Sequence, residues 1–202
     1  QRYNRVAVYY PFTHFKLKDE HGFSEKGRRD IYWPQIEELR DIVDFDLVDE
    51  ILIEDGILEE YDYVIVVQGV TYEADELARL AKWVEDGGVL ITHNLGVPAT
   101  VEGDLATGAK LLSGATLDPV LGAQVAKVGK GCTVVHPQRA DWRGWRRDER
   151  WKDDHPDHPA TNPAFWQTVT ATLANASSLG VGLEDYPVID GALDEVFAAL
   201  CD

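Results

Sequence analysis

The pattern of apolar and polar positions is clearest between Tyr61 and Gly96. Tyr63 to Val67 is a nearly continuous apolar run, which is typical of a strand buried on both faces of a parallel sheet. Apolar residues then recur at helical spacing, and acidic residues occupy the first turn, where the helix dipole favours them. Two glycines end this helix before Val89 to Thr92, a second apolar run. The stretch therefore predicts a strand, a crossover helix and a strand, which make one βαβ unit.

The apolar runs outside this unit predict the rest of a sheet. Strands are expected at Arg5 to Tyr10 and Phe45 to Val48, and a hairpin at residues 124–136 around Gly129-Lys130-Gly131. Residues 11 to 31 are polar, and we expect a long loop there, which is either placed for a ligand contact or a plain surface excursion. Helices are predicted over Tyr32 to Val43, Asp104 to Leu112 and Asn162 to Asn175.

This order of elements predicts an α/β fold, with a flavodoxin-like, doubly wound, mostly parallel sheet and helices on both faces. The 202 residues are ample material for one core. We assign residues 1–176 to this domain and residues 177–202 to a C-terminal extension or linker toward a further domain, because the pattern becomes irregular at Ser177. Leu193 to Leu200 is apolar again and fits either a strand or a helix.

The composition narrows the partners and the compartment. A net charge of −17 argues against nucleic acid and anionic membranes, which need a basic surface. No apolar run approaches the ~20 residues that span a bilayer. Cys132 and Cys201 are too few for a disulfide framework and lack metal-site spacing. We expect a soluble chain, cytoplasmic or secreted, and because it has no methionine we expect that it was processed or excised.

The first candidate site is the turn after Val89 to Thr92, which reads His93-Asn94-Leu95-Gly96. In a flavodoxin-like fold this turn lies at the carboxyl edge of the sheet, where a nucleophile elbow projects a reactive side chain. An elbow needs Cys or Ser, supported by a His and a carboxylate, and this turn has neither nucleophile. We therefore predict no catalytic residue, and His93 and Asn94 either bind a polar ligand or satisfy backbone groups in the turn.

The second candidate is the segment from Arg139 to Lys152, which contains six Lys or Arg residues and three Asp or Glu residues. Exposed Trp beside Arg suits stacking on sugar rings or a hot spot against another chain. The alternative is a self-folded loop in which Arg stacks on Trp. The residues predicted to bind a ligand or a partner are Trp142, Arg143, Trp145, Arg146 and Trp151.

Metal and cofactor sites are not predicted. Asp153 to Pro159 is rich in ligand-type residues, and His155 and His158 are the histidines that a metal would use there. Two prolines in an irregular segment do not present ligands on a fixed scaffold, however. Gly69 follows a strand, but Q-G-V-T-Y lacks the further glycines of a dinucleotide-binding loop, so neither flavin nor nicotinamide is expected.

The stretch YDYVIVVQGVTYEADELARLAKWVEDGGVLITHNLG resembles the core of glutamine-amidotransferase-like domains, in particular the trimerisation domain of family 42 β-galactosidases and related glycoside hydrolases. RVAVYY at the start, the helix from Tyr32-Trp33, and GKGCTVVHP before an apolar helix fit the same plan. The resemblance covers roughly residues 5–175.

This resemblance implies a non-catalytic domain that follows a catalytic barrel, takes part in oligomer contacts and helps to wall the active site of a neighbouring subunit. The expected partners are further copies of the chain or a companion catalytic domain, with carbohydrate as a ligand. The tail YPVIDGALDEVFAALCD resembles a linker into a following β-sandwich, so we expect a piece cut from, or paired with, something larger.

A second resemblance favours a different function. ThuA-like proteins share this fold, carry a His after the equivalent strand and have a G-K-G…N-P-A-F pattern near the end. The matching residues are His93, Gly129-Lys130-Gly131 and Asn162-Pro163-Ala164-Phe165. This resemblance implies a stand-alone protein of sugar metabolism, or an enzyme that uses His93.

Overall fold

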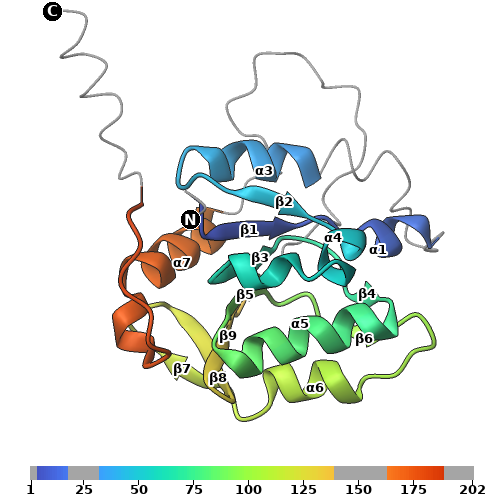
Figure 1. Ribbon diagram of the computed structural model, residues 1–202. Coiled ribbons are helices and arrows are strands. Elements are labelled where there is room, and N and C mark those ends of the chain that lie inside the picture. The colour runs from blue at the N-terminus through green and yellow to red at the C-terminus, as the bar shows by residue number, and fades with distance from the viewer. Residues whose placement is uncertain (1–3, 18–31, 139–162, 189–202) are drawn as a thin grey trace, which may run out of the picture.

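Figure 1 shows the computed structural model of the protein, which describes residues 4–17, 32–138 and 163–188. A seven-stranded sheet forms its centre. The strands in chain order are β1 (Val6–Tyr9), β2 (Asp46–Val48), β3 (Tyr63–Val66), β5 (Val89–His93), β7 (Thr116–Asp118), β8 (Ala123–Val128) and β9 (Gly131–His136). Their spatial order is β2-β1-β3-β5-β9-β8-β7, and β8 and β7 are joined by antiparallel pairing.

The five strands β2-β1-β3-β5-β9 are all parallel, in the order of a flavodoxin-like sheet. The antiparallel hairpin of β8 and β9 extends it at one side. This arrangement confirms the predicted α/β class. A separate pair of short parallel strands, β4 (Thr71–Tyr72) and β6 (Ala99–Thr100), was not expected from the sequence.

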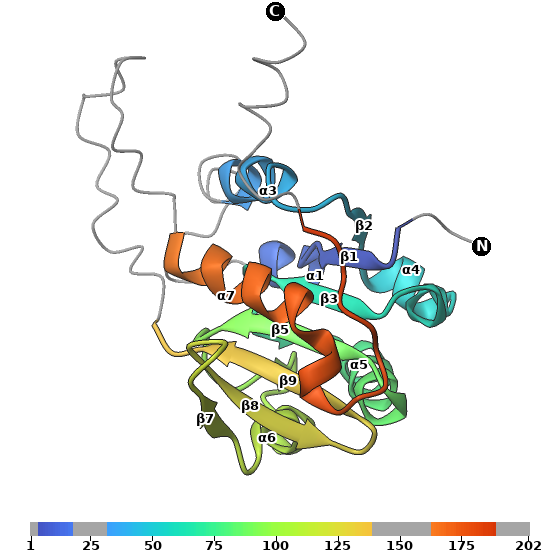
Figure 2. The same cartoon turned by 90° about the vertical axis from the view of Figure 1, so that its left-hand side faces the viewer.

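Helices cover both faces of the sheet (Figures 1 and 2). One face packs against α3 and α7, and the other against α4, η2, α5 and α6. Successive strand residues therefore enter two different cores: Tyr63 and Ile65 face the first, whereas Val64 and Val66 face the second. The bounds are α1 (Phe12–Lys16), α3 (Trp33–Arg40), α4 (Glu50–Glu54), the 3₁₀ helix η2 (Ile57–Glu60), α5 (Ala74–Asp86), α6 (Ala106–Leu112), α7 (Pro163–Ala174) and the 3₁₀ helix η4 (Ala176–Leu179).

The crossover helix α5 is fixed at both ends. At its start, the carboxylate of Glu76 accepts a hydrogen bond from the backbone N–H of Glu73, which satisfies one of the free N–H groups of the first turn. At its end, Gly87 takes a φ of 135°, which a side chain rarely allows. Its apolar stripe is buried against the sheet, as the helical spacing predicts: Leu77, Leu80, Ala81 and Val84.

The turn of the hairpin packs on the end of α5. The backbone N–H of Lys130 donates to the carbonyl of Glu85 at 2.8 Å. A Cβ at Gly129 would lie 2.4 Å from that same carbonyl oxygen, and one at Gly131 would lie 2.2 Å from the carbonyl oxygen of Gly88. The G-K-G sequence is therefore needed for close backbone approach as well as for the turn.

The segment after β1 differs from the prediction. Residues 11 to 31 were expected to form a loop, but Phe12–Lys16 is the short helix α1, and Thr13, His14 and Phe15 are buried. The reason is aromatic packing, because the rings of Tyr10 and Phe15 lie 5.6 Å apart and each contacts Tyr32. Residues 18–31 of the predicted loop lie outside the described residues.

The chain after α7 crosses the amino ends of two strands. The backbone N–H of Tyr186 donates to Leu173, and its ring meets Tyr63, which begins β3, at 5.8 Å. The hydroxyl of Tyr186 lies 3.5 Å from the Asn4 side chain, just before β1. The proposed domain boundary at residue 176 stays a prediction, and the apolar stretch at 193–200 lies outside the described residues.

Within residues 4–17, 32–138 and 163–188, every helix is too short or too polar to cross a bilayer.

Candidate functional site

Two histidines lie side by side at the carboxyl edge of the sheet. His93 is the last residue of β5 and His136 the last residue of β9, and the two are direct partners in the parallel register. Both side chains are buried. The sequence placed His93 in the turn after the strand, but the strand extends one residue further than expected. His93 therefore enters the core face of the sheet, under α7.

The interactions of His93 hold its ring in place. Its Nε2 lies 2.6 Å from the carbonyl oxygen of Val67, and because a carbonyl only accepts, Nε2 carries the hydrogen and donates. The ring also meets Phe165 at 5.1 Å in an edge-to-face contact. His93 therefore links the ends of β5 and β3. A role in ligand binding stays a prediction.

His136 has a hydrogen bond on one side only. The Thr168 hydroxyl donates to the carbonyl of Leu121 at 3.3 Å, so its oxygen accepts from Nδ1–H of His136 at 2.9 Å. This leaves a lone pair on Nε2, which accepts no hydrogen bond from the described residues. Burial lowers the pKa of His136, so the ring is held neutral. A neutral imidazole with a lone pair is the form that accepts a proton.

Asn94 lies outside this buried pair. Its side chain is exposed, and its Nδ2 lies 3.4 Å from the carbonyl oxygen of Pro137, the residue after β9. The backbone turns sharply there, with the N–H of Leu95 donating to the carbonyl of His93. The two predicted residues of this turn thus separate: His93 faces the core and Asn94 faces solvent.

A second buried polar cluster lies at the same edge, on the face covered by α5. The Tyr9 hydroxyl, at the end of β1, donates to the Glu76 carboxylate at 2.5 Å. Burial raises the pKa of Glu76 to about 7, although this hydrogen bond opposes the shift. Burial also raises the pKa of Tyr9, and the Tyr72 ring stacks on Tyr9 at 5.3 Å.

Glu50, at the start of α4, completes this cluster. Its negative charge is one of the causes that raise the pKa of Glu76. One of its oxygens lies 3.7 Å from the Lys16 ammonium, and the Thr13 hydroxyl donates to the same oxygen at 3.4 Å. The other oxygen is buried without a partner among the described residues. Residues of α1 therefore partly neutralise an acidic pair beneath them.

The crevice between β1 and β3 is where a flavodoxin-like sheet binds its ligand, because the strand order reverses there. In this chain its own residues fill that position. A Cβ at Gly69, which follows β3, would lie 2.5 Å from the Cβ of Pro11, so the two loops pack directly together. Gln68 beside it is 1% exposed, and its amide has no hydrogen-bond partner among the described residues. Among the described residues the two loops thus fill the crevice, and a small cavity of about 40 Å³ remains beside it, lined by Gly69, His93 and Asn94 among others.

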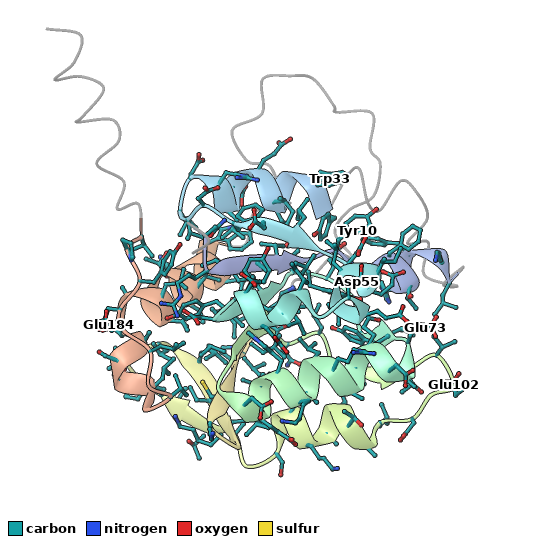
Figure 3. All side chains as sticks on the ribbon, in the orientation of Figure 1. Tyr10, Trp33, Asp55, Glu73, Glu102 and Glu184 are labelled. Atoms are coloured by element: carbon teal, nitrogen blue, oxygen red, sulfur yellow. The ribbon has the colours of Figure 1, made fainter. Side chains whose placement is uncertain are left out.

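An aromatic group borders this crevice. Figure 3 shows Tyr10 and Trp33 close together between α1 and α3, and their rings stack at 5.9 Å. Tyr10 also stacks on Phe12 at 6.3 Å, and the Lys16 ammonium lies 3.8 Å from the Phe12 ring centre. Trp33 is 39% exposed, so the group presents an aromatic surface to solvent.

Among the described residues, no Cys or Ser lies at this edge, although the half-buried Thr71 hydroxyl lies 3.4 Å from Nδ1 of His14 there. Cys132 is in register with Val89 at the opposite, amino end of the sheet. It is buried, and burial raises its pKa to about 11, so it stays a thiol rather than a reactive thiolate. The Thr168 hydroxyl touches His136 but is 2% exposed and donates to a carbonyl. Cys201 lies outside the described residues.

The other predicted site residues also lie outside the described residues, and their roles stay predictions. They are Trp142, Arg143, Trp145, Arg146 and Trp151, with His155 and His158. Within the described part of the chain, no three His, Cys, Asp or Glu side chains gather closely enough to hold a metal ion.

His136, Tyr9, Glu76 and Glu50 were not singled out from the sequence. His136 carries the same signal as His93, because each is a polar residue that directly follows an apolar run in a strand. Glu76 was assigned to the first turn of a helix, and nothing in that pattern indicates a tyrosine from another strand. Such a pair becomes visible only once the sheet order is known.

Comparisons with known proteins agree with this fold. No family model and no curated protein matches the sequence. Among solved structures, Gan42B, a GH42 β-galactosidase, superimposes with a TM-score of 0.51 at 14% identity, over 68% of this chain and 28% of that chain.

Two other solved structures overlap less well. A catalytic mutant of Gan42B from G. stearothermophilus gives a TM-score of 0.45 at 19% identity, over 68% of this chain and 28% of that chain. The exo-β-1,4-mannosidase Op5Man5 from Opitutaceae bacterium strain TAV5 gives 0.42 at 18% identity, over 65% and 30%. At these identities the likeness to Gan42B shows the fold. The chain spans less than a third of the length of each of these proteins.

Proposed function

We propose that this chain is a non-catalytic, glutamine-amidotransferase-like module of a glycoside hydrolase of the β-galactosidase type, where it serves oligomerisation and walls part of a sugar-binding site. The likeness in fold to one region of Gan42B supports this context, because that region makes up only 28% of the β-galactosidase chain and therefore corresponds to one part of a larger enzyme. The catalytic groups of the whole protein would then come from a companion domain or subunit.

The observation that carries the proposal is the packing of the carboxyl edge, where the described residues bury both histidines and include no Cys or Ser. An active domain of this fold needs an exposed nucleophile there, next to a base. In the described residues the histidines are buried under Phe165, and the crevice between β1 and β3 is filled by Pro11 and α1. This edge is built for packing, which favours a structural role.

Exposed apolar side chains support a role in assembly. Leu117, on the outer strand β7, is 68% exposed, and Val120 beside it is 67% exposed. At the other side of the sheet, Leu47 of β2 is 37% exposed and is followed by Ile51 and Leu52 on α4, which are also exposed. Both outer strands have a free edge within the described sheet, and apolar side chains there suit contact with another chain.

Sedimentation velocity of the full chain tests the proposal. We expect a mass of two or more chains that falls with dilution. Leu117→Lys or Leu47→Lys should lower this mass, because a charge would be buried in the contact. Gln167→Lys, on the exposed side of α7, is the matched control and should leave the mass unchanged. A single-chain mass at every concentration, or hydrolysis of a nitrophenyl β-galactoside by this chain alone, would contradict the proposal.

A second candidate function rests on His136. Its Nε2 lone pair, next to His93, fits a proton acceptor in a sugar-modifying enzyme of the ThuA-like kind. Turnover of a keto-sugar by this chain, lost in both His93→Ala and His136→Ala while the fold is retained by circular dichroism, would favour this function. Absence of turnover under the conditions in which the chain assembles would favour the non-catalytic module.

A further inference from the structure

A groove of about 870 Å³ lies at the amino edge of the sheet, opposite the histidines. One wall is the exposed side of α5, and the other is the segment from α4 through η2. Tyr61 lies just before β3 and Gly87-Gly88 just before β5, and all three line it. A volume of this size falls within the range of ~300–1,000 Å³ that small-molecule sites occupy.

Trp83 gives this groove a fixed aromatic wall. Its Nε1–H donates to the carbonyl of Tyr61 at 3.1 Å. A Cβ at Gly88 would meet three atoms of the indole at 2.3 to 2.5 Å, so the ring lies flat on the Cα of this glycine. The side chain is half-buried, and its remaining surface lines the groove. The indole is therefore held in one orientation before any ligand arrives.

Charged side chains stand along the same groove. Lys82 pairs with Asp86, and Arg5 pairs with Asp62. Arg79, Asp75 and Glu59 form no ion pair with any residue that the structure describes, and all three are exposed. Arg79 precedes Trp83 by one helical turn, so the two residues lie on one side of α5, and both line the groove. The groove thus offers a hydrogen-bond donor, carboxylate acceptors and an aromatic face.

We propose that this groove binds a neutral oligosaccharide, with one sugar ring on Trp83 and its hydroxyl groups on Arg79 and Asp75. A sugar combines an apolar C–H face, which packs on an indole, with hydroxyl groups that both donate and accept. Four carboxylates and two cations line the groove, so an anionic polymer is repelled. Its lining residues lie on helices or in connecting segments, Val181 and Leu183 included, and none lies in a strand, so no free strand edge lines the groove to hold an extended peptide.

The proposal is independent of the assembly role. Sugar binding in this groove by a chain that sediments as a monomer would remove the assembly role and leave the groove site intact. An assembled chain that binds no sugar in this groove would remove the groove site and leave the assembly role intact. The two experiments therefore fail separately.

Isothermal titration calorimetry of the full chain with three β-1,4-linked probes, cellotetraose, mannotetraose and galactotetraose, tests the site. We expect saturable binding of at least one. Trp83→Ala should weaken it by about tenfold, the value of one lost stacking contact. Arg79→Ala should weaken it by about threefold to tenfold, as expected for one lost hydrogen bond. In ¹H–¹⁵N spectra, the bound probe should shift the Trp83 indole N–H and the Gly87 and Gly88 amides.

Trp33→Ala is the matched control, because Trp33 is also partly exposed but lies on α3, outside the groove. It should bind like the unaltered chain. If Trp83→Ala does not fold, the spectra of the unaltered chain and the Arg79→Ala titration decide the question. Absence of saturable binding by all three probes, binding that is lost with Trp33 instead of Trp83, or shifts caused by a peptide and not by the sugars would overturn the proposal.

Discussion

At the carboxyl edge, the two faces of the sheet bury titratable groups of opposite chemistry: an imidazole on the face covered by α7 and a carboxylic acid on the face covered by α5. Under Phe165, burial lowers the pKa of His136, which favours the neutral imidazole. Beneath α1, burial raises the pKa of Glu76 to about 7, which favours the neutral carboxylic acid. A base and an acid are thus both held uncharged at one edge. Burial thus holds one titratable group uncharged on each face of the sheet, whereas the nearby Glu50 carboxylate pairs with the Lys16 ammonium.

The two faces must respond to pH in opposite directions. Glu76 has a raised pKa in the fold, so its contribution to stability is complete below its ordinary value of 4.5 and is lost as pH rises through about 7. His136 has a lowered pKa, so its contribution is complete above its ordinary value of 6.5 and is lost as pH falls through the folded value. Between about pH 4.5 and pH 7, Glu76 therefore makes stability fall as pH rises, and His136 opposes this trend below pH 6.5.

The largest effect is expected from Phe165→Ala. The Phe165 side chain is completely buried and contacts both histidine rings, so its loss should lower the free energy of unfolding by about 3–5 kcal/mol. Urea denaturation measures this change. Gln167→Ala, on the exposed side of the same helix, is the control and should cost less than about 0.5 kcal/mol. Equal costs for the two variants would mean that the edge is open.

Glu76→Gln should change the pH profile by the next largest amount. The unaltered chain should lose of order 3 kcal/mol between pH 4.5 and pH 9 because Glu76 must ionise while buried, and the variant should lose less. Urea midpoints measured across this range give the profile. Glu85→Gln, an exposed residue of the same helix, should keep the profile of the unaltered chain. A variant as pH-sensitive as the unaltered chain would contradict burial of the acid.

Tyr9→Phe should have a smaller effect that depends on pH. The Tyr9 hydroxyl donates to Glu76, and its loss removes a hydrogen bond worth about 1–3 kcal/mol to the charged carboxylate and less to the neutral acid. The variant should therefore be more destabilised at pH 8 than at pH 5, by thermal unfolding. Tyr186→Phe removes a hydroxyl at a longer distance from its partner and serves as the control. A cost that is equal at both pH values would show that Glu76 does not ionise.

His136→Asn should have the smallest effect, a change of slope on the acid side. The Asn amide can still donate to Thr168, but it has no group that gains a proton as pH falls. The variant should therefore lose less stability than the unaltered chain between pH 7 and pH 5. Thr168→Val keeps the imidazole and should retain the acid-side slope. An unchanged slope in His136→Asn would mean that this histidine is already exposed.

The sheet and its helices were predictable because they depend on local patterns. The continuous apolar run at Tyr63 to Val67 and the helical spacing of α5 specify a buried strand and a packed helix in sequence alone. The short helix α1 was missed because its residues are helical through contact with Tyr10 and Tyr32, which lie elsewhere in the fold. Strand β7 is three residues long, with two of them exposed, so it has no apolar pattern.

The candidate site was predictable only in its position. The sequence predicts a polar turn at the carboxyl edge, and His93 and Asn94 lie there. It does not predict that His93 donates to Val67 or that Tyr9 meets Glu76, because these partners are 26 and 67 residues apart. Such contacts depend on the order of the strands. The exposed groove beside Trp83 likewise depends on how η2 packs next to α5.

The most direct test of two buried, uncharged groups at the carboxyl edge is an NMR titration that follows Glu76 and His136 in one labelled sample of the full chain. The account predicts that the side-chain carboxyl carbon of Glu76 titrates near pH 7 and that the His136 imidazole titrates below pH 6.5. Both groups would then be uncharged together at pH values between the two midpoints. A Glu76 midpoint near 4.5, with a His136 midpoint above 6.5, would mean that both are charged and open to water, and would contradict it.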